Sequence, residues 1–90
     1  MAHVTFTPHL TRFFPELAEG DIEAATVREL VQALDRRYPG FASYVVDEAG
    51  RLRRHVNIFV GEEPIRDRDA LSDRLEPATP VFIVQALSGG

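Results

Sequence analysis

One strongly amphipathic segment limits the folds that are open to this 90-residue chain. Thr26 followed by Glu29 forms the Thr-x-x-Glu pattern of a helix N-cap, and Pro39 with Gly40 supplies the stop. Between these signals the apolar side chains recur at spacings of three and four and form one stripe: Val27, Leu30, Val31, Leu34 and Tyr38. A lone helix has to bury such a stripe against a second layer, and one sheet is the simplest layer available.

Five segments have the composition and alternation of β-strands. We predict them at residues 3–7, 22–25, 53–60, 62–65 and 81–84. In the segment 53–60, alternation sorts the side chains into an inward set, Val56, Ile58 and Val60, and an outward set, His55, Asn57 and Phe59. The segment 81–84 is an unbroken apolar run, which is typical of a central strand covered on both faces.

The connecting segments are expected to be irregular. Residues 11–19 predict a loop with an aromatic anchor, and residues 41–46 a packed loop. Residues 67–75 predict a short helical turn in which aspartates and interleaved arginines pair with one another. Pro8 is expected to end the first strand because proline cannot donate to a strand ladder.

The order of these elements predicts an α+β fold of the β-grasp, or ubiquitin-like, type. It would hold a mixed four- to five-stranded sheet with one main helix packed across it, although other small α+β folds share the same order. Residues 1–86 are expected to form this domain, and residues 87–90 a flexible C-terminal tail that ends in two glycines.

Composition excludes several classes of function. The chain has no cysteine, which removes disulfides, iron–sulfur clusters and thiolate chemistry. All ten basic residues are arginine, so a Schiff-base lysine and a Walker-type lysine are excluded as well. A net charge of −4 argues against nucleic acid as a partner, and no apolar run approaches the length of a membrane span. No signal peptide precedes the first strand, so we expect a cytoplasmic protein.

Local clusters of polar residues give weaker signals. His3, His9 and His55 are scattered without a ligand spacing, so no metal site is predicted. No glycine-rich phosphate loop is present, and no catalytic cluster indicates an enzyme. The arginines of residues 51–54 could contact phosphate, but in an acidic domain they are more often a solvated strand end or a salt-bridging rim.

The feature that points to chemistry is the pair Gly89 and Gly90 directly after the last predicted strand. Glycine has the thinnest backbone and the widest range of φ and ψ, so a diglycine end can thread a narrow channel in another protein. A terminal carboxylate is a poor electrophile until it is adenylated, after which it accepts sulfur or an amine. Gly90 would then be the reactive residue, supported by Gly89, with Leu87 and Ser88 as partner contacts. The alternatives are an ordinary frayed terminus or a remnant of cloning.

The chain resembles the MoaD/ThiS family of ubiquitin-like sulfur-carrier proteins, and most closely its CysO-type branch. The resemblance rests on residues 54–60, the acidic turn before Ile65, the last hydrophobic strand and the terminal glycines. It implies that an E1-like enzyme of the MoeB/ThiF type adenylates Gly90. Conversion to a thiocarboxylate follows, and this group donates sulfur in cofactor or cysteine biosynthesis.

The same resemblance implies which partners the chain has. ATP and magnesium are expected on the activating enzyme, and no cofactor on this chain. The sulfur acceptor would be an enzyme such as the molybdopterin-synthase large subunit or cysteine synthase. The alternative is a ubiquitin-like protein modifier or a non-catalytic interaction module.

Two aromatic residues are expected to serve as a partner-docking patch. Phe59 lies opposite the inward face of its strand, and Phe82 or Ile83 shares that side if the last strand pairs beside it. The alternative is that Tyr44 or the loop holding Phe13 and Phe14 folds over them.

Overall fold

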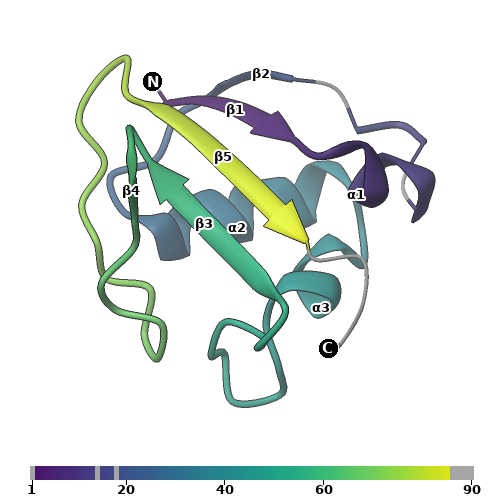
Figure 1. Cartoon of the computed structure of the whole chain (residues 1–90). Coiled ribbons are helices and arrows are strands. Elements are labelled where there is room, and N and C mark those ends of the chain that lie inside the picture. Colours follow the sequence, from purple (N-terminus) through teal and green to yellow (C-terminus); the bar gives the residue numbers. More distant parts are fainter. Residues whose placement is uncertain (1, 14, 18, 86–90) are drawn as a thin grey trace.

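The computed structural model describes residues 2–13, 15–17 and 19–85. One mixed sheet has the order β2-β1-β5-β3-β4 (Figure 1). Its strands are β1 (Ala2–Phe6), β2 (Gly20–Ile22), β3 (Val56–Val60), β4 (Glu63–Pro64) and β5 (Pro80–Gln85). The central strand β5 runs parallel to β1 and antiparallel to β3, while β2 and β4 form the edges through antiparallel pairing. The predicted mixed sheet of a β-grasp fold is confirmed.

Helix α2 (Val27–Arg37) lies across one face of this sheet, as predicted (Figure 1). The backbone N–H of Glu29 donates to Thr26 Oγ1 at 3.2 Å, and Glu29 Oε1 accepts from the backbone N–H of Ala25 at 3.2 Å. The first bond satisfies a donor that a helix start leaves without an intrahelical partner, and the second ties the residue before the N-cap to the first turn. The chain leaves the helix through Gly40, whose φ of 94° suits a residue without a Cβ.

The core lies between α2 and the sheet. The helix contributes Val27, Leu30, Val31 and Leu34, all buried. The strands contribute alternate inward side chains, which are also buried: Val4, Val56, Ile58, Val81 and Ile83. The alternation predicted for residues 56–60 is therefore confirmed.

Two short helices occupy segments that we expected to be loops. Helix α1 (Pro8–Phe13) starts at the proline that ends the first strand, because proline at the first helical position has no N–H to leave unpaired. Its Leu10 is fully buried. Helix α3 (Phe41–Val45) follows Gly40 and buries Phe41 and Val45, four positions apart on one face.

Three strand predictions need correction. The second strand is Gly20–Ile22 rather than residues 22–25, because the backbone after it turns toward another segment, where the N–H of Leu75 donates to Ala25 O at 2.8 Å. The third strand begins at Val56, since residues 53–55 form a turn. The central strand β5 is covered on one face only, because Phe82 on the other face is 44% exposed.

The segment 67–75 holds no helix, and its carboxylates do not pair with its arginines. Asp73 accepts the backbone N–H groups of Arg66 and Asp67. Asp67 accepts those of Asp69 and Ala70 and both the N–H and the hydroxyl of Ser72. Side-chain capping of backbone donors therefore shapes this loop.

The same loop supports the start of α2. The backbone N–H of Val27 donates to Asp73 O at 3.0 Å, and that of Arg28 donates to Leu71 O at 2.9 Å. Leu71 itself is buried with a φ of 55°, a left-handed conformation that a non-glycine residue adopts only when its surroundings impose it. The loop thus acts as a structural element of the core.

Acid should weaken this loop. The Ser72 hydroxyl, followed by the Ala70 N–H, donates to Asp67 and lowers the pKa of its carboxyl to about 2, against 3.8 in an unfolded chain. A lowered pKa in the folded state adds stability above about pH 3.8, and this stability is lost as the pH falls toward 2. We expect the urea midpoint of the wild type to fall between pH 5 and pH 2, and that of Asp67→Asn to fall less. Equal pH dependence in the two proteins would show that Asp67 does not couple protons to folding.

None of the helices within the described residues is long and apolar enough to cross a membrane.

Candidate functional site: the end of the central strand

The last described residue, Gln85, ends the central strand β5 as the structure describes it and has partners on both sides. Gln85 pairs with Val56 of β3 on one side, and its N–H lies 3.5 Å from Thr7 Oγ1 on the other. Its side-chain Oε1 is buried and has no hydrogen-bond partner among the described residues. The point from which the chain continues toward residue 90 is therefore fixed by two neighbouring segments.

Four predicted site residues lie outside the described residues: Leu87, Ser88, Gly89 and Gly90. Their roles, and the boundary between a domain of residues 1–86 and a tail of residues 87–90, stay predictions.

Phe59 and Phe82 share the open face of the sheet. They are direct register partners between β3 and β5, so their side chains are cross-strand neighbours. Phe59 is partly buried and Phe82 is 44% exposed, which makes Phe82 the exposed large apolar side chain among the described residues. Figure 1 shows this face toward the viewer, with α2 behind the sheet.

The register extends this pair into a row across the sheet. Thr5 of β1 pairs with Phe82, and Pro64 of β4 pairs with Phe59. The outward direction predicted for Phe59 is confirmed. Of the two candidates Phe82 and Ile83, it is Phe82 that shares its side, since Ile83 is buried in the core. The alternative that neighbouring aromatics cover the face is wrong for Phe82, which keeps nearly half of its surface exposed. Whether a partner binds there stays a prediction.

A basic groove lies beside the end of β5, and the sequence indicated only one of the two basic segments that line it. Residues 51–55 were predicted to be a solvated strand end or a salt-bridging rim, and Arg51 Nε does lie 3.4 Å from Asp47 Oδ2. The structure adds Arg66 and Arg68 from the loop after β4. The backbone N–H of Leu52 donates to Arg68 O at 2.8 Å, and this long-range contact brings the two segments together.

His3 lies at the opposite end of the sheet, between two carboxylates. Its Nδ1 is 3.1 Å from Asp21 Oδ1 and its Nε2 is 3.2 Å from Glu19 Oε2. These bonds, the one with Asp21 above all, raise the pKa of His3 above its usual value of 6.5. Within the described residues no group of three or more histidine, aspartate or glutamate side chains is placed to hold a metal ion.

A β-grasp domain whose central last strand leads within a few residues to a diglycine has the architecture of ubiquitin-like carriers and modifiers. The ThiS family model matches residues 11–90, and the chain belongs to this family. It is 31% identical over 75 residues to the sulfur carrier protein CysO of Mycobacterium tuberculosis and of Mycobacterium bovis. These matches cover 81% of this chain and 76% of each relative, and they support a sulfur-carrier role on the CysO-like branch.

Solved structures confirm the fold. The CysO complex with BexX of Amycolatopsis orientalis matches with a TM-score of 0.84 at 23% identity, over 100% of both chains. CysO of Mycobacterium tuberculosis matches with a TM-score of 0.82 at 22% identity, over 97% of this chain and 100% of that one. SAMP1 of Haloferax volcanii follows with 0.76 at 21% identity, over 99% and 98% of the two chains.

Proposed function

We propose that this chain is a sulfur carrier whose Gly90 carboxylate is adenylated by an E1-like enzyme and converted to a thiocarboxylate. One observation carries the proposal. The central strand β5 is paired with β1 up to Ile83 and with β3 up to Gln85, and Gln85 lies five residues before Gly90. A rigid base with a slender end places a carboxylate in a partner's active site while the folded domain stays outside it.

The chemistry divides between this chain and its partner. A Gly90 carboxylate oxygen attacks the α-phosphorus of ATP and releases pyrophosphate, which gives an acyl adenylate. A sulfide-equivalent nucleophile then attacks the carbonyl carbon, so that the C–S bond forms, the C–O bond to phosphate breaks and AMP leaves. ATP and magnesium belong to the activating enzyme, and this chain supplies the carboxylate and the glycine backbone. The chain therefore acts as a carrier rather than as an enzyme.

The similarity to CysO also guides the choice of acceptor. Among the two acceptors expected from the sequence, it favours a cysteine synthase over the molybdopterin-synthase large subunit. The solved complex of CysO with BexX is a protein assembly of a relative, and it supports a protein partner for this chain as well.

The direct test is the intact mass. Incubation with an activating enzyme from the same genome, ATP and a sulfur donor should raise the mass of the chain by about 16 Da, the replacement of one oxygen by sulfur. Omission of ATP should prevent the shift. Higher-mass covalent adducts with other proteins, without a sulfur-bearing form, would instead support a ubiquitin-like modifier. Full activity with a tag fused after Gly90 would support a simple interaction module.

The exposed aromatic pair should contribute to partner docking. We expect Phe82→Arg to lower kcat/KM for the modification by about tenfold or more, because an aromatic side chain exposed on a flat sheet face is a typical binding hot spot. Its urea midpoint should stay close to that of the wild type. Gln32→Arg, on the exposed side of α2, is the matched control and should leave kcat/KM unchanged. Equal rates for all three proteins would remove this face from the docking surface.

A further inference from the structure

A groove of ≈ 880 Å³ separates the segment before β3 from the loop after β4. Its basic lining is contributed by two segments: Arg51, Arg53, Arg54 and His55, and Arg66 with Arg68. Three aspartates also line it, at positions 47, 67 and 69, so five arginines against three carboxylates leave a formal charge of +2. This local excess of positive charge lies on a chain whose net charge is −4.

Three of the arginines are used to build the groove. Arg68 donates from Nη1 to Asn57 Oδ1 at 2.8 Å, and from Nη2 to the carbonyls of Arg53 and Val56 at 2.8 and 2.9 Å. Arg53 Nε donates to Ser43 O at 2.9 Å, and Arg51 pairs with Asp47. These bonds hold the turn before β3 against α3 and the loop after β4. The groove is therefore a defined feature of the fold.

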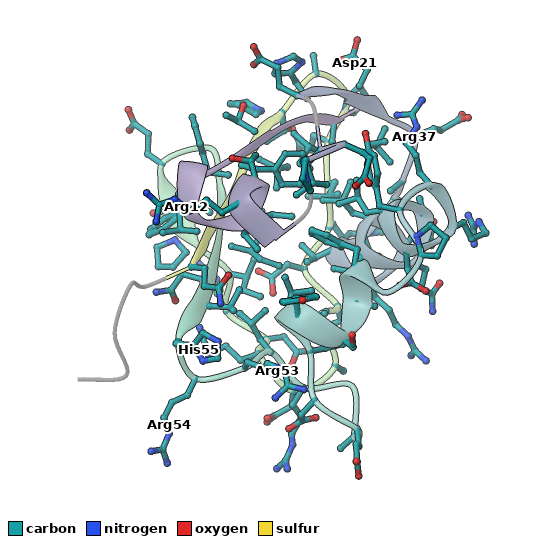
Figure 2. The ribbon with its side chains drawn as sticks, turned by 90° about the vertical axis from the view of Figure 1, so that its right-hand side faces the viewer. Arg12, Asp21, Arg37, Arg53, Arg54 and His55 are labelled. Atoms are coloured by element: carbon teal, nitrogen blue, oxygen red, sulfur yellow. The ribbon has the colours of Figure 1, made fainter. Side chains whose placement is uncertain are left out.

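The other two arginines, Arg54 and Arg66, do not form such bonds. The side chains of Arg54 and Arg66 are exposed, and neither forms a hydrogen bond or ion pair with any described residue. Figure 2 shows Arg54 pointing away from the protein, with His55 next to it. Two of the three carboxylates are meanwhile engaged by backbone N–H groups, Asp47 with those of Ala49 and Arg51, and Asp67 as described above.

The position of the groove relates it to the reactive end of the chain. Val56 pairs with Gln85, so Arg54 and His55 directly precede the residue that pairs with the last described residue of β5. Farther along the same strand, Phe59 belongs to the exposed aromatic pair. An apolar centre with a charged rim is the usual anatomy of a protein interface.

We propose that the groove docks an acidic segment, rich in aspartate and glutamate, of the enzyme that activates Gly90; this rests on the proposed function. Guanidinium groups bind carboxylates in a bidentate manner, and Arg54 and Arg66 are free to do so. Because they come from two separate segments and the groove is open to solvent, it suits an extended acidic peptide. A localised positive patch also orients an otherwise acidic chain as it approaches its partner.

The first test needs no enzyme. We would titrate the isotope-labelled chain with a hexaglutamate peptide at low salt and follow the backbone amides by NMR. Shifts should gather at Arg54, His55 and Arg66 and disappear at 1 M NaCl, where the screening length falls to about 3 Å. Shifts spread evenly over all surface arginines, or no shifts at all, would overturn the proposal.

A pair of charge-matched variants sharpens the test. Arg54→Glu/Arg66→Glu removes the two free cations, while Arg36→Glu/Arg37→Glu makes the same change of charge at the end of α2, away from the groove (Figure 2 labels Arg37). The first variant should lose the peptide-induced shifts and slow the mass gain at low salt by about tenfold or more, and the second should retain both. Equal losses of peptide shifts and of rate in the two variants would show that only net charge matters, and equal retention would show that neither pair of arginines matters. Either result would overturn the proposal.

These readouts separate the two proposals. A wild-type chain that gains mass at the same rate as the groove variant would refute the groove and leave the sulfur-carrier function intact. A wild-type chain that binds the peptide in the groove but never gains mass would refute the sulfur-carrier function, and with it the activating enzyme as the source of the acidic segment.

Discussion

A chain without Gly89 and Gly90 is expected to gain no sulfur at all, while its stability stays unchanged. The loss should be complete, because the new terminus would carry a side chain and would end two residues short of the partner's ATP. Within the described residues, β5 pairs with β1 up to Ile83 and with β3 up to Gln85, and we expect the fold not to depend on these two residues. Intact mass spectrometry after the activation reaction measures the first effect, and urea unfolding measures the second.

Single substitutions before the diglycine provide the control for this truncation. Leu87→Ala and Ser88→Ala keep a terminal glycine carboxylate at its normal distance from the strand, so they should slow the mass gain without abolishing it. A truncated chain that still gained sulfur would show that the reactive group lies elsewhere. A truncated chain that unfolded would show that the end of the chain is part of the core.

Phe41→Ala should cause the largest loss of stability among single truncations. Phe41 is fully buried, and its ring meets that of Phe6 edge to face, with centroids 5.8 Å apart and an interplanar angle of 75°. Removal of a buried phenylalanine side chain costs about 3–5 kcal/mol through lost transfer energy and the cavity left behind. Domains of this size have a total stability on the order of 5–15 kcal/mol, so the loss is a large share. Urea unfolding at 25 °C gives the value.

Phe82→Ala is the matched control for this experiment. It deletes the same side chain from the open face of the sheet, where Phe82 is 44% exposed, and should cost much less than the buried substitution. Similar losses for the two variants would contradict the placement of Phe41 in the core, on the buried face of α3.

The parts of the fold that sequence reasoning predicted are those with local signals. The start of α2 is encoded by Thr26 and Glu29, and its buried face by a regular apolar stripe. The inward face of β3 follows from strict alternation. The direction of Phe59 follows from the same alternation, whereas the choice of Phe82 over Ile83 as its neighbour depends on a register that only the folded sheet sets.

The missed parts depend on contacts between distant segments. Helices α1 and α3 have six and five residues, too few to be stable alone, and they exist because Leu10 and Phe41 are buried by the rest of the chain. Sequence analysis found only one of the two segments that line the basic groove, because the segment of Arg66 and Arg68 is brought beside residues 51–55 by a long-range bond from the Leu52 N–H to Arg68 O. The signal that could have found it is the arginine content of the loop after β4, which we had assigned to pairing with its own aspartates.

The most direct test of the carrier mechanism is to locate the added sulfur within the chain. Since the chain has no lysine and Arg74 is its last arginine, trypsin releases residues 75–90 as one peptide. After activation, the fragment ions of this peptide that contain Gly90 should be heavier by about 16 Da, and those that lack Gly90 should be unchanged. Added mass on fragments without Gly90, or an unmodified peptide beside a modified remainder, would contradict the account.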